Sequence, residues 1–164
     1  MATLSLPLFL AYSNNKDSKI LILGSFPSVK SRENNFYYGH PQNRYWRVLS
    51  HLWDEPVPQT VEQKRDFLLR HYIAAWDVIA DCEIVGSSDA SIRDVIPNDL
   101  SPIFAVADIR AVFVNGGTAA RLYQKHMKNY PPAIVLPSTS PANAAWSLER
   151  LCRAWAIVKE KAEE

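Results

Sequence analysis

Residues 36–46, with the sequence Phe-Tyr-Tyr-Gly-His-Pro-Gln-Asn-Arg-Tyr-Trp, concentrate side chains that could grip and work on a planar base. Tyr38 presents a flat aromatic face, Asn43 a carboxamide and Arg44 a guanidinium. The segment follows a turn with the sequence Gly-Ser-Phe-Pro-Ser at residues 24–28, and it lies between an apolar run and an amphipathic stretch. These two segments are therefore the first candidates for a ligand site.

The turn at residues 24–28 differs from three familiar loop types. A hydrolase nucleophile elbow needs a serine centred between two glycines, and residue 28 is serine instead of glycine. A Walker phosphate loop needs a lysine, and a dinucleotide fingerprint needs a glycine spacing that this turn lacks. The turn therefore belongs to none of these three loop types.

Positive charge gathers around the two segments. Lys30, Arg32, Arg44 and Arg47 stand against the single acid Glu33 between residues 24 and 47. The whole chain carries a net charge of only +1, whereas a protein that tracks phosphates is usually far more basic. The local patch is compatible with phosphate contacts and equally with a solvated loop of ordinary surface charges.

The elements that must position these residues follow an α/β pattern. Four β-rich runs, at residues 20–24, 73–79, 111–115 and 133–136, alternate with amphipathic stretches. The first run is almost continuously apolar, as a strand covered on both faces should be. With right-handed crossovers, the sequence predicts a three-layer α/β/α sandwich around a four-stranded, mainly parallel sheet, in one domain spanning residues 1–164.

Helix boundaries are indicated by capping patterns and by periodicity. Thr60 with Gln63 predicts a capping box for a helix through Tyr72, and Ser101 followed by a proline predicts another helix start. Thr118 is the expected cap of the helix after the third strand. A helix is expected from near residue 43, with an apolar stripe at Tyr45, Leu49, Leu52 and Trp53, and a last helix with a stripe at Leu148, Leu151, Trp155 and Val158.

Composition bounds the class of protein. With 48% hydrophobic and 21% charged residues in 164, the chain is typical of a soluble globular domain. No apolar run is long enough to cross a bilayer and no basic region precedes the apolar N-terminus, so we expect a cytoplasmic protein, associated with the nucleoid in a prokaryote. Cys82 and Cys152 are too few for a zinc knuckle, a four-cysteine cluster or a disulfide framework.

Ligands of a parallel sheet bind at the carboxyl ends of its strands. The loops at residues 24–43, 80–98, 115–118 and 137–143 are therefore the ones to inspect. Two sequence blocks in them resemble signatures of the uracil-DNA glycosylase superfamily, and most closely the hypoxanthine-DNA (deoxyinosine) glycosylases. The turn at residues 24–28 is similar to the first signature, and the resemblance extends over roughly residues 20–160.

By this resemblance, the first turn lines the base pocket with Gly24, Ser25, Phe26 and Pro27. Many families of the group carry at its third or fourth residue an Asn or Asp that positions the attacking water, and here Phe26 or Pro27 stands there. The water-activating group must then come from another segment. By the same resemblance, we expect Ser28, Lys30 and Arg44 to contact DNA. 

Residues 40–46, His-Pro-Gln-Asn-Arg-Tyr-Trp, resemble a block shared by mismatch-specific uracil glycosylases and hypoxanthine glycosylases. The match places Tyr38 where an aromatic ring stacks on the flipped base, a contact of roughly 1–3 kcal/mol that offsets much of the cost of unstacking. It makes Asn43 the catalytic residue, with an amide oxygen that accepts a proton from water and orients it toward C1′. An Asn before an amphipathic stretch is also a common helix cap.

Residues 136–143, Leu-Pro-Ser-Thr-Ser-Pro-Ala-Asn, resemble the second signature, a loop that enters the minor groove and pinches phosphates. Ser138 stands where the best-known uracil enzymes have a histidine. The hydroxyls of Ser138, Thr139 and Ser140, together with Asn143, are therefore expected to bind DNA. The alternative is a polar turn in which Asn143 caps the following helix.

Three further residues complete the expected base pocket. Trp76 falls near the place where uracil glycosylases have an asparagine that hydrogen-bonds to the edge of the pyrimidine. An indole N–H cannot make the same set of hydrogen bonds. Asp77 could accept a hydrogen bond from N1–H of hypoxanthine, or could simply cap the turn after its strand. Asn115 stands at the end of the third strand, before a glycine pair that permits close backbone approach.

The resemblance implies a monofunctional DNA glycosylase of base excision repair that hydrolyses the N-glycosidic bond of a deaminated base without cofactor or metal. The likeness of the chain to the hypoxanthine-DNA glycosylases makes hypoxanthine the leading expected substrate. The expected partner is DNA that contains such a base, bound by a monomer without membrane contact. Two alternatives stay open: the same reaction on uracil or another mismatched pyrimidine, and a relative that binds nucleotides or DNA without catalysis.

Overall fold

The computed structural model of the protein describes residues 2–5, 13–25, 38, 41–84 and 92–164. Its main sheet has four parallel strands in the order β3-β2-β6-β7. The strands are β2 (Ile20–Gly24), β3 (Ile73–Asp77), β6 (Ala111–Asn115) and β7 (Ala133–Leu136). The predicted sheet is confirmed, with its second strand ending at Asp77, two residues before the predicted end.

A second, antiparallel sheet has three strands in the order β1-β4-β5. They are β1 (Ala2–Ser5), β4 (Ile79–Ile84) and β5 (Ile92–Pro97). The loop predicted at residues 80–98 is wrong, because β4 and β5 occupy much of this range. The strands were missed because they contain charged residues and β5 ends in a proline, so their pattern is weaker than the apolar run of β2.

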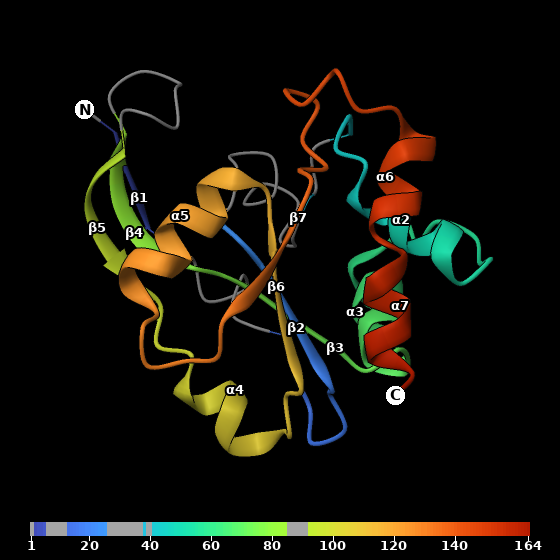
Figure 1. Ribbon diagram of the computed structural model, residues 1–164, viewed down its shortest axis with the longest axis horizontal. Helices are drawn as coiled ribbons and strands as arrows, with labels where there is room; N and C mark the ends of the chain where they lie inside the picture. The colour runs from blue at the N-terminus through green and yellow to red at the C-terminus, as the bar shows by residue number, and fades with distance from the viewer. Residues whose placement is uncertain (1, 6–12, 26–37, 39–40, 85–91) are drawn as a thin grey trace.

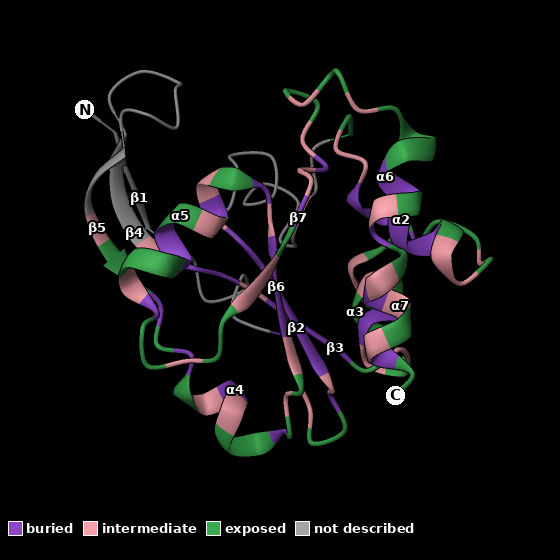
Figure 2. Cartoon of the chain, in the orientation of Figure 1, coloured by how far each residue is buried: buried purple, intermediate pink, exposed green. Residues whose placement is uncertain are grey.

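Helices cover both faces of the main sheet (Figure 1). On one face lie α2 (Tyr45–Leu52), α3 (Val61–Arg70), α6 (Leu148–Ala154) and α7 (Ala156–Ala162), whose buried side chains pack with Ile20, Ile22 and Phe113. On the other lie α4 (Ser101–Val106) and α5 (Gly117–His126), which pack with Leu21, Leu23 and Val112. Alternate residues of β2 thus enter opposite cores, and Figure 2 shows this strand in the colour of buried residues. The three-layer prediction is confirmed.

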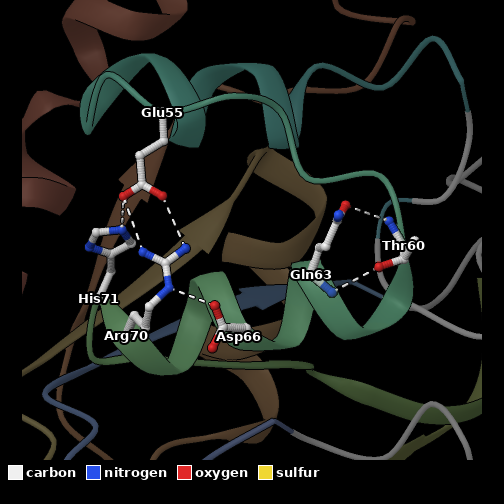
Figure 3. A network of polar contacts seen from close by, with 6 residues as sticks. All are labelled: Glu55, Thr60, Gln63, Asp66, Arg70 and His71. Carbon is white, nitrogen blue, oxygen red and sulfur yellow. Dashed lines mark hydrogen bonds and ion pairs between the residues drawn. The ribbon is translucent and has the colours of Figure 1, made fainter.

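The helix starts test the predicted caps. Thr60 and Gln63 form the predicted capping box at the start of α3 (Figure 3), and α4 begins at Ser101 with a proline in its first turn. Thr118 is not a cap, because α5 begins at Gly117 after Gly116, whose φ of 97° ends the strand in a conformation that favours glycine. The predicted last helix is divided into α6 and α7 at Trp155.

An ion-pair network joins the segment after α2 to the end of α3 (Figure 3). Glu55 accepts from both Nη atoms of Arg70, at 3.0 and 3.4 Å. Its Oε2 also lies 2.5 Å from Nε2 of His71. Arg70 also donates to Asp66 at 2.6 Å. The His71 ring stacks on Trp53 at a centroid distance of 4.4 Å, so the network fixes α2 against α3.

Of the helices in the described ranges, none is both long and apolar enough to cross a bilayer.

Candidate active site

The register of the parallel sheet gathers polar residues at the carboxyl ends of its strands. Gly24 of β2 lies opposite Asp77 of β3, and Asn115 of β6 lies opposite Leu136 of β7, which leads into the loop at residues 137–147. Tyr38 and Asn43 reach the same edge from the connection between β2 and α2. The site therefore forms where parallel α/β sheets bind their ligands.

Gly24 permits an unusually close approach of side chains. A Cβ atom on this glycine would lie 2.5 Å from Oδ1 of Asp77 and 2.9 Å from the hydroxyl oxygen of Tyr38. The missing side chain therefore brings a carboxyl and a phenol together over the end of β2.

Asp77 places a carboxyl group in a dry environment. The residue is 4% exposed, and burial raises the pKa of its carboxyl to about 7. Its backbone oxygen accepts from Nδ2 of Asn98 at 2.8 Å, but Oδ2 of its side chain has no hydrogen-bond partner among the described residues. A buried carboxyl oxygen with unused acceptor capacity suits a ligand that brings its own N–H group.

Tyr38 lies flat against a second tyrosine. Its ring stacks on that of Tyr45, with centroids 3.8 Å apart and planes 13° from parallel, and its own backbone has a φ of 55°. Burial and, second, the neighbouring Asp77 raise the pKa of the Tyr38 hydroxyl above its usual range, so the group stays protonated. Asn115 lies close enough to moderate this shift, yet within the described part of the chain the hydroxyl completes no hydrogen bond.

A chain of hydrogen bonds runs from β6 to the start of α2 through Thr139, which is fully buried. Asn115 accepts from the backbone N–H of Thr139 at 3.1 Å and donates through Nδ2 to Oγ1 of Thr139 at 3.0 Å. That hydroxyl donates to Oδ1 of Asn43 at 2.9 Å. The same Oδ1 accepts from the backbone N–H of Tyr45, also at 2.9 Å.

The network alters the predicted chemistry of Asn43. An amide oxygen has two lone pairs, and both are engaged by these donors. The oxygen that was expected to accept a proton from water is thus already occupied. The alternative that Asn43 is the helix cap is wrong, because the N-cap of α2 is Arg44 and no side chain caps it; the bond from the N–H of Tyr45 to Asn43 spans two residues, as in an Asx turn that leads into the helix.

Arg44 faces inward in the structure. Its Nη2 donates to the carbonyl oxygens of Ser140 and Asn143, each at 3.0 Å, and its Nη1 donates to that of Trp146. Its backbone N–H donates to the carbonyl of Thr139 at 3.0 Å. This geometry indicates that Arg44 holds the loop in place, and it does not favour the predicted contact of Arg44 with DNA.

The loop at residues 137–147 also uses its own side chains to maintain its shape. The hydroxyl of Ser138 accepts from the N–H of Ser140 at 3.1 Å, and that of Ser140 accepts from the N–H of Ala142 at 3.2 Å. Nδ2 of Asn143 donates to the carbonyl of Ser138 at 3.0 Å, and the cap of α6 is Ser147 instead. The two serine hydroxyls keep their protons for another acceptor, so their contact with phosphate stays a prediction.

The remaining predicted residues differ in where the structure places them. Thr139 departs from its expected role in DNA binding, because its side chain is fully buried and its hydroxyl and N–H are both engaged inside the protein. Trp76 is half-buried and packs against both apolar cores, beside Leu23 on the neighbouring strand. Ser25 is half-buried, and its backbone carbonyl accepts from the N–H of Ile79 at 2.9 Å. The predicted residues Phe26, Pro27, Ser28 and Lys30 lie outside the described residues.

Tyr45 is the site residue that the sequence analysis missed. The apolar stripe of α2 assigned it to the core, where it is indeed fully buried, but its ring also supports Tyr38. Aromatic residues at both ends of the block from 36 to 46 were the available signal.

The arrangement combines donors, acceptors and aromatic faces without a set of metal ligands. Across the described ranges, His, Cys, Asp and Glu side chains form no group of three that could hold a metal ion. Asp77 can accept a hydrogen bond from a ring N–H, Tyr38 offers an aromatic ring, and the amino group of Asn43 can donate a hydrogen bond. Such a set suits the edge and face of a heterocyclic base.

Comparison with known proteins identifies relatives over nearly the whole chain. A model of the uracil DNA glycosylase superfamily matches residues 11–160. A hypoxanthine DNA glycosylase from Methanosarcina acetivorans is 34% identical over 139 residues, which cover 83% of this chain and 87% of the relative. A protein of the same description from Methanosarcina barkeri is 33% identical over 146 residues, covering 87% and 90%.

A solved structure shares both the fold and part of the sequence. The solution NMR structure of a candidate uracil DNA glycosylase from Methanosarcina acetivorans aligns with a TM-score of 0.79 and 31% identity, covering 94% of this chain and 97% of the other. The family match, the two relatives and this structural likeness all point to one group of proteins. The chain belongs to the uracil DNA glycosylase superfamily.

Proposed function

We propose that the protein is a DNA glycosylase that removes hypoxanthine, the deamination product of adenine, from DNA. The observation that carries the proposal is the buried carboxyl of Asp77, whose Oδ2 has no hydrogen-bond partner in the described part of the chain. The hypoxanthine DNA glycosylases that resemble this chain at 33% and 34% identity support the same substrate.

The chemistry of deamination explains why an unpaired carboxyl oxygen suits this task. Adenine and cytosine each present a ring nitrogen with a lone pair on the Watson–Crick edge. Deamination turns that nitrogen into an N–H donor, at N1 of hypoxanthine and N3 of uracil. An ionised Asp77 accepts from the damaged base and repels the lone pair of the undamaged parent. Guanine and thymine also carry such an N–H, so they must be excluded by shape.

The proposed reaction is hydrolysis at C1′ of the extruded nucleotide. The oxygen of a water molecule bonds to C1′ while the bond from C1′ to N9 breaks, and the electron pair of that bond leaves with the base. A proton from water ends on the base, so the products are free hypoxanthine and an abasic site. Hydrogen-bond donors placed around the departing base stabilise the charge that it develops.

A second substrate, uracil, is favoured by one specific observation. The N3–H of uracil can bond to the same oxygen of Asp77, and the structural relative from M. acetivorans is described as a candidate uracil DNA glycosylase. The two substrates differ in size and in the position of the bond to the sugar, so they can be separated by experiment.

A panel of duplexes tests the proposal. Each duplex carries one hypoxanthine, uracil, xanthine or undamaged adenine at the same position, and abasic sites are measured under single-turnover conditions. We expect cleavage at hypoxanthine and none at adenine. Faster cleavage at uracil would transfer the assignment to the second substrate, and binding without cleavage of any base would leave a non-catalytic DNA-binding protein.

A further inference from the structure

The orientation of the Asn43 carboxamide is fixed by groups that cannot change their hydrogen-bonding character. The backbone N–H of Thr139 requires an acceptor, which is Oδ1 of Asn115 at 3.1 Å. The Nδ2 of Asn115 must then face Oγ1 of Thr139, which accepts from it at 3.0 Å. The hydroxyl proton of Thr139 therefore points onward to Asn43.

The other end of the chain imposes the same orientation. The backbone N–H of Tyr45 also requires an acceptor and lies 2.9 Å from Oδ1 of Asn43. The Thr139 hydroxyl donates to this oxygen at 2.9 Å. Two fixed backbone donors, one at each end, thus hold Oδ1 inward. Only the amino group of the carboxamide can still offer hydrogen bonds to a substrate.

We propose that Thr139 is a positioning residue that acts through Asn43: its buried hydroxyl keeps the Asn43 oxygen turned inward, so that Asn43 meets the substrate as a hydrogen-bond donor through Nδ2. This inference rests on the proposed glycosylase function and changes the role of Asn43 within it. The amino group donates to the base, which becomes negatively charged as the bond to C1′ breaks. Asn43 does not accept the proton of the attacking water.

Charge substitution at residue 43 separates a donor from an acceptor. Asn43→Asp keeps an oxygen for both Tyr45 and Thr139 but has no N–H, and its negative charge lies near the departing base. We expect single-turnover excision of hypoxanthine to fall about 100-fold or more in Asn43→Asp, at least as far as in Asn43→Ala. An active Asn43→Asp enzyme would overturn the donor role.

Substitution of Thr139 tests the positioning role itself. Thr139→Val retains the shape but removes the hydroxyl, and we expect the excision rate at saturating enzyme to fall about 10- to 100-fold, with affinity for uncleavable 2′-fluoro-deoxyinosine duplex within about threefold. Thr139→Ser restores the hydroxyl and should recover the rate to within about threefold of the native value. A rate unchanged in Thr139→Val, or not recovered in Thr139→Ser, would overturn the proposal.

A double substitution distinguishes action through Asn43 from a separate structural effect. If Thr139 acts through Asn43, then Thr139→Val should slow an Asn43→Ala enzyme by no more than about twofold. Full additivity of the two losses would overturn the proposal. Ser18→Ala is the matched control, because it removes a buried hydroxyl bonded to Asn15 at 3.1 Å before β2, at the opposite end of the sheet. Its excision rate should match the native rate.

One readout does not depend on catalysis. In a two-dimensional ¹⁵N NMR spectrum, the side-chain amide signals of Asn43 are assigned by their loss in Asn43→Asp. They should shift in Thr139→Val and stay nearly unchanged in Thr139→Ser, and signals that ignore Thr139→Val would overturn the proposal. If the native protein cleaves no base in the panel, the proposed function fails, while this spectrum still decides the orientation of Asn43.

Discussion

At the scale of single residues, Asp77 controls whether the pocket can accept a hydrogen bond. Its carboxyl is buried at the end of β3 and has a pKa raised to about 7. Below that pH the group is protonated and can donate to the N1 lone pair of adenine. Above it, the carboxylate accepts from N1–H of hypoxanthine. Discrimination between damaged and undamaged purines should therefore improve as the pH rises.

This behaviour predicts a pH profile for base excision. We expect the single-turnover rate on hypoxanthine to rise by up to about tenfold between pH 5.5 and pH 8, with a midpoint near 7, as Asp77 ionises. Asp77→Asn should flatten the profile, because its amide does not titrate. Rates measured in both proteins over that range check the prediction, and an unchanged midpoint in Asp77→Asn would contradict it.

The stability of Asp77→Asn tests the raised pKa of Asp77 independently of catalysis. In the unfolded chain an aspartate loses its proton near pH 3.9, whereas Asp77 keeps it to about 7 in the native state. The native state thus binds more protons between these values, and the free energy of unfolding decreases as the pH rises from about 4 to 7. Asp77→Asn should be more stable than the native protein at pH 8, by on the order of 1–3 kcal/mol.

Tyr38 should act through the face of its ring. Its hydroxyl completes no hydrogen bond within the described ranges, while its ring stacks on Tyr45. We expect Tyr38→Ala to weaken binding of a hypoxanthine duplex about 5- to 150-fold, the equivalent of roughly 1–3 kcal/mol of stacking. Tyr38→Phe should bind nearly as well as the native protein. Equal losses in a fluorescence titration of the two variants would implicate the hydroxyl instead.

The sequence could identify these residues but not their contacts. Asp77 and Gly24 were predictable as neighbours, because the ends of parallel strands meet at one edge of a sheet. The Tyr38–Tyr45 stack was not, because it depends on a backbone φ of 55° at Tyr38 that a tyrosine pattern does not indicate. Nor could the sequence show which atom of Asn43 faces inward.

At the scale of elements, Arg44 joins the start of α2 to the loop between β7 and α6. Its guanidinium donates to three backbone carbonyls of that loop. Arg44→Gln should therefore lower thermal stability and slow excision, while leaving the salt dependence of DNA binding unchanged. Loss of a phosphate contact would instead reduce the logarithmic salt slope by about 1. DNA affinities measured between about 50 and 200 mM salt distinguish these outcomes.

Arg47 offers a comparison within the same helix. Its side chain is exposed, and among the described residues its hydrogen bond is a long one, of 3.5 Å from Nη2 to the carbonyl of Gln42. If the positive patch contacts DNA through this face, Arg47→Gln should reduce the salt slope that Arg44→Gln leaves unchanged.

The network around Glu55 should stabilise the packing of α2 on α3 in a pH-dependent way. Hydrogen bonds from Arg70, and then from His71, lower the pKa of Glu55. Its contribution is therefore present above the unfolded pKa near 4.3 and is lost as the pH falls through the lower native pKa. Glu55→Gln should cost about 1 kcal/mol at pH 7, or about 2–4 °C in Tm, and less at pH 3.

An exposed ion pair serves as the control for Glu55. Glu149 lies 3.5 Å from Arg153 one turn along α6, and both side chains are largely exposed, at 79% and 70%. Glu149→Gln should change stability by less than about 0.5 kcal/mol. A loss as large as that of Glu55→Gln would show that charge alone, and not the network, is responsible.

Elements of the main sheet were easier to predict than those of the second sheet. β2 and β6 are apolar on both faces and stand out in the sequence, and the capping box at Thr60 fixes the start of α3. In the described part of the chain, β4 pairs with β1 and β5 and stays separate from the main sheet, and the charged residues of β4 and β5 resemble a loop. The division at Trp155 was hidden because the apolar stripe continues through both α6 and α7.

At the scale of the whole molecule, we expect the proposed chemistry to need only the protein and water. The side chains in the described ranges contain no cluster of three metal ligands, and the chain has only two cysteines. We expect excision of hypoxanthine to proceed at the same rate after dialysis against EDTA and in its presence. Loss of activity that added Zn²⁺ or Mg²⁺ restores would contradict this prediction and require a ligand set outside those ranges.

The order of the main sheet also has a consequence during synthesis. β2 lies between β3 and β6, so Ile20 must wait for Ile73 and then for Ala111 before both of its edges are paired. Translation at about 5–20 residues per second separates Gly24 from Thr139 by roughly 6–23 seconds. During this interval the most apolar strand leaves the ribosome before its neighbours exist. A nascent chain is therefore exposed to aggregation and to chaperones early, and it can complete the site at the sheet edge only after Thr139 has been synthesised.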